Sequence, residues 1–202
     1  MPSMPSMPGT PMAGMEGMEG MGTPMAEADA SAMEIDMAYI DMMIPHHESI
    51  VALSQAALPR LTDERLRTIA QAIIDAQTAE VAELRGLRDE FYGSPDPEPL
   101  DDAAMMRLTP DMAMPMGEMM GQMDAATQVT SFCSASDPDL AFIDLVIPHH
   151  ESAIAASETA LDQATHHRIR DFAERVIADQ QREIEELEAI RADLSGEATP
   201  AG

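Results

Sequence analysis

The chain has 202 residues, of which 37 are acidic and 11 basic, so its formal net charge at pH 7 is −26. This charge repels nucleic-acid phosphates and anionic membranes and attracts cations, which excludes nucleic acid as a partner. There is a single cysteine, Cys133, so an internal disulfide and a cysteine-based zinc or iron–sulfur site are excluded as well. No apolar run is long enough to span a membrane, and no signal peptide is recognisable at the N-terminus.

The first 30 residues are rich in Met, Pro and Gly and predict a disordered Met-rich tail over 1–30. The chain contains 20 methionines, and they gather in residues 1–25 and 105–123. Methionine used to fill a core would be spread through the helices. This placement therefore favours a chemical role for the thioether.

An internal repeat organises the rest of the chain. Residues 37–93 align with 140–196 without gaps, and 24 of the 57 paired positions are identical. The 3–4 spacing of apolar residues predicts a helical hairpin in each copy. The first helix is expected over about 35–58, with its counterpart over 138–161. The second helix of the first copy is expected over about 63–92. Gly93 and Gly196 predict the ends of the second helices.

Neither hairpin can bury its apolar stripe alone, so the predicted fold is all-α, a ferritin-like four-helix bundle over 31–196. Its two duplicated hairpins are joined by a long Met-rich crossover, residues 94–136. Within this crossover, residues 94–104 predict an open acidic linker and residues 116–129 a short helix. Residues 197–202 predict a flexible tail.

Each copy carries the same motif, YIDMMIPHHES at 39–49 and FIDLVIPHHES at 142–152. Pro45 and Pro148 fall inside the first helix of each hairpin, where proline removes a donor and predicts a kink. Adjacent residues of a helix point about 100° apart. One histidine of each pair is therefore expected to face the interior and the other a flank or groove.

Methionines accompany only the first pair of histidines. Met42 and Met43 lie three or four residues before His46 and His47 and share their side of the helix. The second copy has Leu145 and Val146 at the matching positions. We therefore expect a softer metal site in the first copy, and in the second a harder or purely structural site.

The second helix of each hairpin offers polar partners. A turn centred near Leu61 predicts Gln77 beside His46, and Glu80 near the two methionines of the first copy. The same arithmetic pairs His149 with Gln180. One alternative is a purely structural hydrogen-bond network from imidazole to amide to carboxylate.

Thioether and imidazole donors without thiolate clusters favour copper over zinc or a hard cation. Closely spaced methionines of the crossover also suit Cu(I) or Ag(I). The candidate metal-binding residues are Met42, Met43, His46, His47, His149, His150, Met112, Met114, Met116, Met119 and Met120. The candidate accessory residues are Asp41, Glu48, Gln77, Glu80, Asp144, Glu151, Gln180 and Glu183.

The two motifs, together with AIIDAQTAEVAEL and RVIADQQREIEEL downstream, resemble a ferritin-like family of domains of unknown function that includes a periplasmic copper-binding protein. The resemblance covers about 37–196 and implies an extracytoplasmic four-helix bundle with a role in copper binding and resistance. The ligands that it implies are Met42, Met43, His46 and His47, with His149 and His150 in the second copy. Leu145 and Val146 depart from the methionine usual in that family.

The sequence thus predicts a periplasmic or secreted copper-binding protein that is not an enzyme. It would sequester or transfer copper, as Cu(I) with Cu(II) or Ag(I) as further cargoes, in copper homeostasis or resistance. Metal ions and copper-transport proteins are the expected partners of a monomer or weak oligomer. The alternatives are a His/carboxylate metal-dependent oxidoreductase and a partner-binding bundle with methionines as adaptable contacts.

Overall fold

The structure, a computed structural model, describes residues 24–110, 112 and 115–196, with side chains from residue 35 onward. Within these residues all regular structure is helical and there is no strand, which confirms the predicted all-α class. The helices are α1 (Pro24–Ala57), α2 (Glu64–Tyr92), α3 (Asp102–Leu108), α4 (Met116–Gln122), α5 (Ala125–Ser134), α6 (Pro138–Gln163) and α7 (His167–Ser195).

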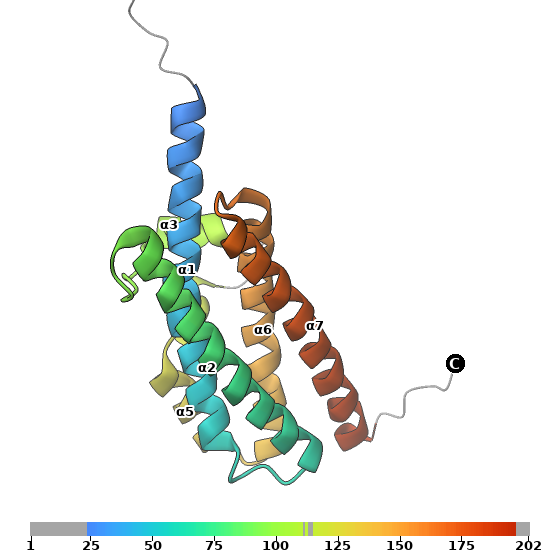
Figure 1. Ribbon diagram of the computed structural model, residues 1–202. Helices are drawn as coiled ribbons and strands as arrows, with labels where there is room; N and C mark the ends of the chain where they lie inside the picture. Colours follow the sequence, from blue (N-terminus) through green and yellow to red (C-terminus); the bar gives the residue numbers. More distant parts are fainter. Residues whose placement is uncertain (1–23, 111, 113–114, 197–202) are drawn as a thin grey trace, which may run out of the picture.

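The four long helices form a bundle of two hairpins (Figure 1). Helix α1 packs along α2, α6 packs along α7, and the two hairpins meet mainly where α1 lies against α6. The crossover helices lie against the outside of this bundle: α5 contacts α1 and α6, and α3 contacts the same two helices. The two similar halves of the sequence therefore fold into two equivalent hairpins joined by a helical crossover.

The predicted ends of the second helices are confirmed. Gly93 follows α2 with φ 76°, and Gly196 follows α7 with φ 71°. Both angles lie in the left-handed region, where glycine has no side chain to clash. The Gly93 N–H donates to the carbonyl of Asp89, which closes the last turn of α2.

Helix α1 begins at Pro24 and not near residue 35, so residues 24–30, assigned to the disordered tail, are helical. Alanine, methionine and glutamate between Pro24 and Ile35 are good helix formers, and proline suits the first turn. The rest of the predicted tail, 1–23, and the predicted tail 197–202 lie outside the described residues.

The crossover is more helical than expected. Helix α3 starts at Asp102, inside the segment predicted to be open, because Asp101 accepts a hydrogen bond from the Ala104 N–H and caps it. The single helix predicted over 116–129 is two helices, α4 and α5. Asp124 starts the second by accepting a hydrogen bond from the Thr127 N–H.

Each hairpin is fastened to the turn of the other by an aspartate. The buried Asp36 of α1 accepts hydrogen bonds from the Thr165 N–H (2.9 Å) and hydroxyl, in the turn between α6 and α7. The matching Asp139 of α6 accepts from the Thr62 N–H (2.8 Å) and hydroxyl, in the turn between α1 and α2. We call these two contacts the aspartate clamps.

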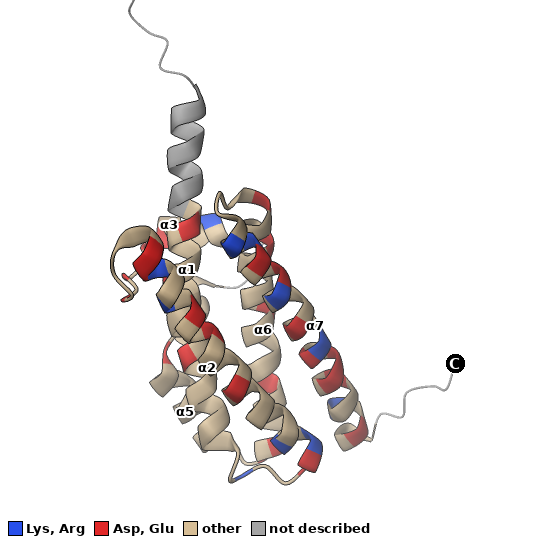
Figure 2. Ribbon diagram, viewed as in Figure 1, with Lys and Arg blue, Asp and Glu red and all other residues tan. Residues whose placement is uncertain are grey.

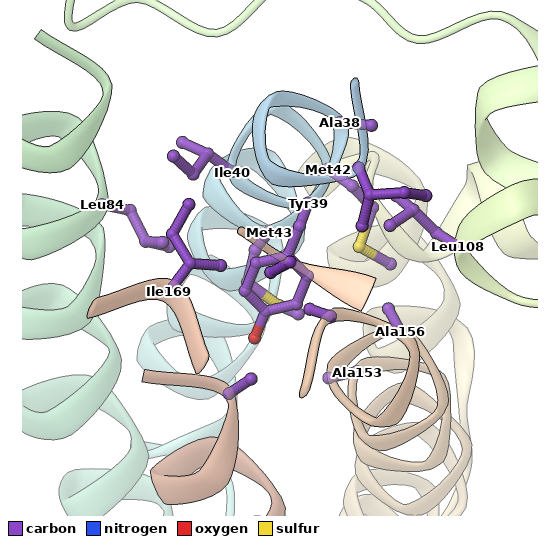
Figure 3. Packing of buried hydrophobic residues seen from close by; sticks show 14 of the residues in the cluster. Ala38, Tyr39, Ile40, Met42, Met43, Leu84, Leu108, Ala153, Ala156 and Ile169 are labelled. Atoms are coloured by element: carbon purple, nitrogen blue, oxygen red, sulfur yellow. The ribbon is translucent and has the colours of Figure 1, made fainter. Parts of the chain in front are cut away.

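Apolar side chains fill the bundle around the two sequence motifs. Figure 3 shows Tyr39, Met42 and Met43 of α1 packed among side chains from α2, α6 and α7. All three are fully buried. Met42 and Met43 are therefore core side chains as well as candidate ligands.

Charged residues occur along all the long helices and are dense along α7 (Figure 2). In the part of the chain that the structure describes, no helix combines the length and apolar character that a bilayer span requires.

Candidate metal centre

The four motif histidines lie inside the bundle. His46 and His47 of α1 and His149 and His150 of α6 are all 0% exposed, and both helices continue through their internal prolines. The prediction placed one histidine of each pair toward the interior and the other toward a flank or groove; in the structure both histidines of each pair are buried. Each first helix is covered by its own hairpin partner on one side and by the other hairpin on another, so both directions are buried.

His46 and His149 meet at the junction of the two hairpins. Their ring centroids are 3.6 Å apart with the planes tilted by 36°. The Nε2 atom of His46 lies 2.8 Å from the hydroxyl of Ser152, and the Nε2 atom of His149 lies 3.0 Å from the hydroxyl of Ser49. Each ring is therefore held by a serine of the opposite hairpin.

The other two histidines point toward the second helix of their own hairpin. The Nε2 atom of His150 lies 2.7 Å from Oε2 of Glu183. The Nε2 atom of His47 lies 3.0 Å from Oε2 of Glu80, although the pair is not aligned for a hydrogen bond. The two copies thus place equivalent carboxylates against equivalent imidazoles.

The prediction placed Gln77 beside His46 and Glu80 near the methionines, with a glutamine and a glutamate facing each histidine pair. A glutamate does face a histidine in each hairpin, but in the first hairpin Glu80 meets His47. Gln77 and Gln180 are buried, but the carboxylates are what meet the histidines. Helical side chains lean toward the N-terminus of their own helix. The two helices of a hairpin run in opposite directions, so the side chains of α1 tilt away from the turn and those of α2 tilt toward it. The side chain that meets His47 therefore comes from a residue of α2 that is farther from the turn than residue counting predicts.

At least one ring nitrogen of every motif imidazole has no hydrogen-bond partner, and in His47 neither nitrogen has one. The Nδ1 atoms of His46, His47, His149 and His150 are all buried and make no hydrogen bond. Buried polar atoms are rarely left in this state, and each orphan calls for an explanation. A ring held through one nitrogen with the other free is the usual arrangement of a metal-ligating histidine. A purely structural network would not explain the free Nδ1 atoms.

Burial also keeps the central rings neutral. The pKa values of His46 and His149 are lowered well below 6.5, mainly because both rings are removed from water and also because other imidazoles lie nearby. A neutral imidazole offers its lone pair to a cation without first losing a proton. Both rings are therefore neutral at neutral pH, with one nitrogen of each ring unprotonated.

The methionines are brought only partly together. Met42 contributes to the wall of a pocket of about 520 Å³, with Met120 and Met123 from the crossover. Met119 is buried beside the hydroxyl of Thr109, and Met112 and Met116 are partly buried. Met114 lies outside the described residues. Met123 was not among the candidates, although it is the last methionine of the same run.

The candidate carboxylates of the first helices face away from the imidazoles. Asp41 is buried against Arg88, with 2.5 Å between its Oδ1 and the arginine Nε. Glu48 pairs with Arg85, and Asp144 with Arg191, at more exposed positions. Glu151 is exposed. Their negative charges are therefore neutralised or solvated and do not line the histidine cluster.

Sequence reasoning missed Ser49 and Ser152 as partners of the histidines. The available signal was their recurrence at the same position of both copies, directly after His-His-Glu. Among the described residues, no three histidine, cysteine, aspartate or glutamate side chains converge as a ready-made metal site. The centre is instead a pair of imidazoles in close, tilted contact, flanked by two imidazole–carboxylate pairs and by buried thioethers.

The all-α fold and the repeated motif agree with the protein family whose model matches the chain. The chain belongs to the DUF305 family, a domain of unknown function, whose model matches residues 2–88 and 36–191. No curated protein matches the chain.

Solved structures share this fold. CopM in the Cu(II)-bound form superposes with a TM-score of 0.64 at 24% identity, covering 79% of this chain and 97% of CopM. CopM in the Cu(I)-bound form gives 0.62 at 20% identity, covering 79% and 96%. A DUF305 protein of Streptomyces coelicolor, described as a candidate secreted protein, gives 0.63 at 19% identity, covering 79% and 91%. At these identities the likeness shows a common fold.

Proposed function

We propose that this protein binds copper outside the cytoplasm and sequesters it or passes it on, without catalytic turnover. One observation carries the proposal: four buried imidazoles of the duplicated motif keep an Nδ1 atom without a partner. The crystallisation of CopM, a structural relative, in Cu(I)- and Cu(II)-bound forms supports it.

The donor types favour copper over other metals. Imidazole binds both Cu(I) and Cu(II), whereas thioethers select Cu(I). In the first hairpin His46 and His47 would bind the ion with Met42 and Met43, which are buried on the preceding turn of α1. In the second hairpin His149 and His150 have Leu145 and Val146 in place of the methionines. The first hairpin would therefore hold Cu(I) more tightly than the second.

An extracytoplasmic location suits both the cargo and a structural relative described as a candidate secreted protein. The net charge of −26 would also raise the local concentration of copper ions at the surface. Copper-transport proteins are the expected exchange partners.

The test is an anaerobic Cu(I) titration against a chromogenic competitor, with the wild type compared with Met42→Leu/Met43→Val. This double variant gives the first hairpin the side chains of the second. We expect it to lose at least about tenfold in Cu(I) affinity and much less in Cu(II) affinity, because thioether sulfur selects Cu(I). Met105→Leu, a substitution of another fully buried methionine in the same core cluster, is the matched control and should bind as the wild type does.

Wild-type binding no tighter than micromolar would sink the proposal. Turnover of oxygen or peroxide by the purified metal-loaded protein would instead favour the oxidoreductase alternative.

A further inference from the structure

Two serine hydroxyls link the hairpins where His46 and His149 meet. Ser49 and Ser152 are both fully buried and occupy matching positions of the two copies. Each one contacts a ring nitrogen of the other hairpin: Ser49 meets His149, and Ser152 meets His46. Each serine also contacts the backbone carbonyl of the histidine three residues before it in its own helix.

The proton of Ser49 is committed to carbonyl oxygens. The hydroxyl lies 2.7 Å from the carbonyl of His46 and 2.5 Å from the carbonyl of Gln122. A carbonyl can only accept, so the single hydroxyl proton must be given to these oxygens. The contact between Ser49 and Nε2 of His149 then requires the ring nitrogen to be the donor. His149 therefore carries its proton on Nε2, and its Nδ1 atom has a free lone pair.

The same proton count applies to the other serine. The hydroxyl of Ser152 lies 2.8 Å from the carbonyl of His149 and 2.8 Å from Nε2 of His46. If the carbonyl takes the hydroxyl proton, His46 must donate through Nε2. The alternative would leave two acceptor oxygens in contact without a hydrogen in a fully buried site, which is unfavourable.

We propose that Ser49 and Ser152 are positioning residues, each of which fixes the Nε2–H tautomer of the histidine in the opposite hairpin. The consequence is a matched pair of Nδ1 lone pairs, both buried and both free of a proton. This deepens the proposed function, and only its copper-affinity part rests on that function. The tautomers themselves are a property of the metal-free protein.

The hydroxyl of Ser49 has one contact that the hydroxyl of Ser152 lacks. The carbonyl of Gln122 is in the last turn of α4, the helix that carries Met119 and Met120. Ser49 therefore joins the methionine-bearing crossover to the ring of His149 through one hydroxyl. Ser49 should consequently fix the tautomer of His149 more strongly than Ser152 fixes that of His46.

The experiment measures the tautomers directly by ¹⁵N NMR of histidine-labelled, metal-free protein, through long-range couplings from the ring protons. In the wild type we expect a pyridine-type Nδ1 and a pyrrole-type Nε2 for both His46 and His149. Ser49→Ala should release the tautomer of His149 while that of His46 is retained. Ser152→Ala should do the reverse.

This crossed pattern separates positioning from a merely structural role. A local effect of Ser49→Ala would disturb His46, which lies on the same helix, more than His149. Ser54→Ala is the matched control, because Ser54 is equally buried on α1 and its hydroxyl has no partner. Ser49→Thr keeps a hydroxyl and should restore the tautomer of His149.

An Nδ1-protonated His46 or His149 in the wild type would overturn the proposal, even if a serine variant failed to fold. The proposal would be overturned equally if Ser49→Ala folded and left the tautomer of His149 unchanged.

Copper titration of the same variants provides the second readout. Loss of a side chain that orients a metal-binding histidine typically costs about ten- to a hundredfold in metal affinity, so Ser49→Ala should weaken copper binding in that range. If each serine variant changes the tautomer of the histidine in the opposite hairpin but the protein binds no copper, the proposed function is refuted and the role of the serines in fixing the tautomers is upheld. Tight copper binding that Ser49→Ala does not weaken would refute the proposed effect of Ser49 on copper affinity and uphold the proposed function.

Discussion

At the scale of single residues, the burial of His46 and His149 makes the fold sensitive to protons. Both rings are 0% exposed and lie against each other, which lowers their pKa values well below 6.5. A proton on either ring would place a charge in the bundle interior beside a second imidazole. The folded protein therefore resists a protonation that the unfolded chain accepts freely.

The metal-free protein should lose stability as the pH falls. In the unfolded chain the pKa of these histidines is about 6.5. Below that pH the unfolded state binds protons that the folded state excludes, so the free energy of unfolding decreases steadily toward the lowered pKa values; above it, their contribution is constant. Urea denaturation between about pH 8 and pH 5 measures this change. A flat profile down to pH 5 would contradict the prediction.

One hydroxyl distinguishes the two copies of the motif. The hydroxyl groups of Tyr39 and Ser157 share a hydrogen bond of 2.8 Å. At the matching positions Phe142 has no hydroxyl group, and the hydroxyl of Ser54 has no hydrogen-bond partner. Tyr39→Phe should therefore destabilise the fold by about 1 kcal/mol, the usual net value of such a bond.

The reciprocal change tests the same point. Phe142→Tyr should give Ser54 a partner and cost little, because the first hairpin already accommodates the larger side chain. Chemical denaturation of both variants measures the effects. A loss from Phe142→Tyr as large as that from Tyr39→Phe would show that the two environments are not equivalent.

At the scale of elements, the aspartate clamps set how the hairpins dock. The start of α6 fastens the turn between α1 and α2, and Asp36 of α1 fastens the turn between α6 and α7. These turns lie at opposite ends of the bundle (Figure 1). A carboxylate that accepts two backbone or hydroxyl hydrogens fixes both the height and the rotation of the helix that carries it.

Removing either clamp should loosen the docking of the hairpins. Asp36→Ala and Asp139→Ala should each destabilise the fold by about 1.5–3 kcal/mol, the range for hydrogen bonds to a charged group. Because the clamps lie far apart, their effects should add. Thermal denaturation of the single and double variants measures this, with Asp171→Ala at an exposed position of α7 as the control. A double variant no less stable than the single variants would contradict independent clamps.

The sequence predicted the elements better than their contacts. Apolar periodicity and two glycines gave the long helices and their ends, because these features depend on neighbours within the chain. The pairing of Glu80 with His47 depends on the lean of side chains in an antiparallel hairpin, which residue counting ignores. The roles of Ser49 and Ser152 depend on contacts between hairpins, and a serine looks alike in a sequence whether it caps, packs or orients a ring.

At the scale of the whole molecule, charge opposes compactness. The chain carries 37 acidic and 11 basic side chains, and most of the acidic side chains that the structure describes are exposed; acidic residues recur along the helices in Figure 2. Several arginines pair with carboxylates there, but too few are present to balance the excess. Repulsion between carboxylates therefore raises the free energy of the folded state.

Salt should stabilise the protein. Raising the ionic strength from about 0.01 M to 0.15 M shortens the screening length from about 30 Å to about 8 Å, which weakens repulsion across the molecule. The thermal midpoint should rise over this range. Equal midpoints in sodium and potassium chloride would show that screening, and not a specific ion, is responsible. A midpoint that falls with salt would mean that the surface ion pairs outweigh the repulsion.

The crossed contacts between the repeats also bear on how the two copies can evolve. Ser49 serves a ring of the second copy and Ser152 a ring of the first, and the aspartate clamps are exchanged in the same way. A mutation at one of these residues therefore changes the hydrogen bonds of the other hairpin. Changes in the two halves are therefore constrained together, and each half can diverge only as far as the contacts of the other half tolerate.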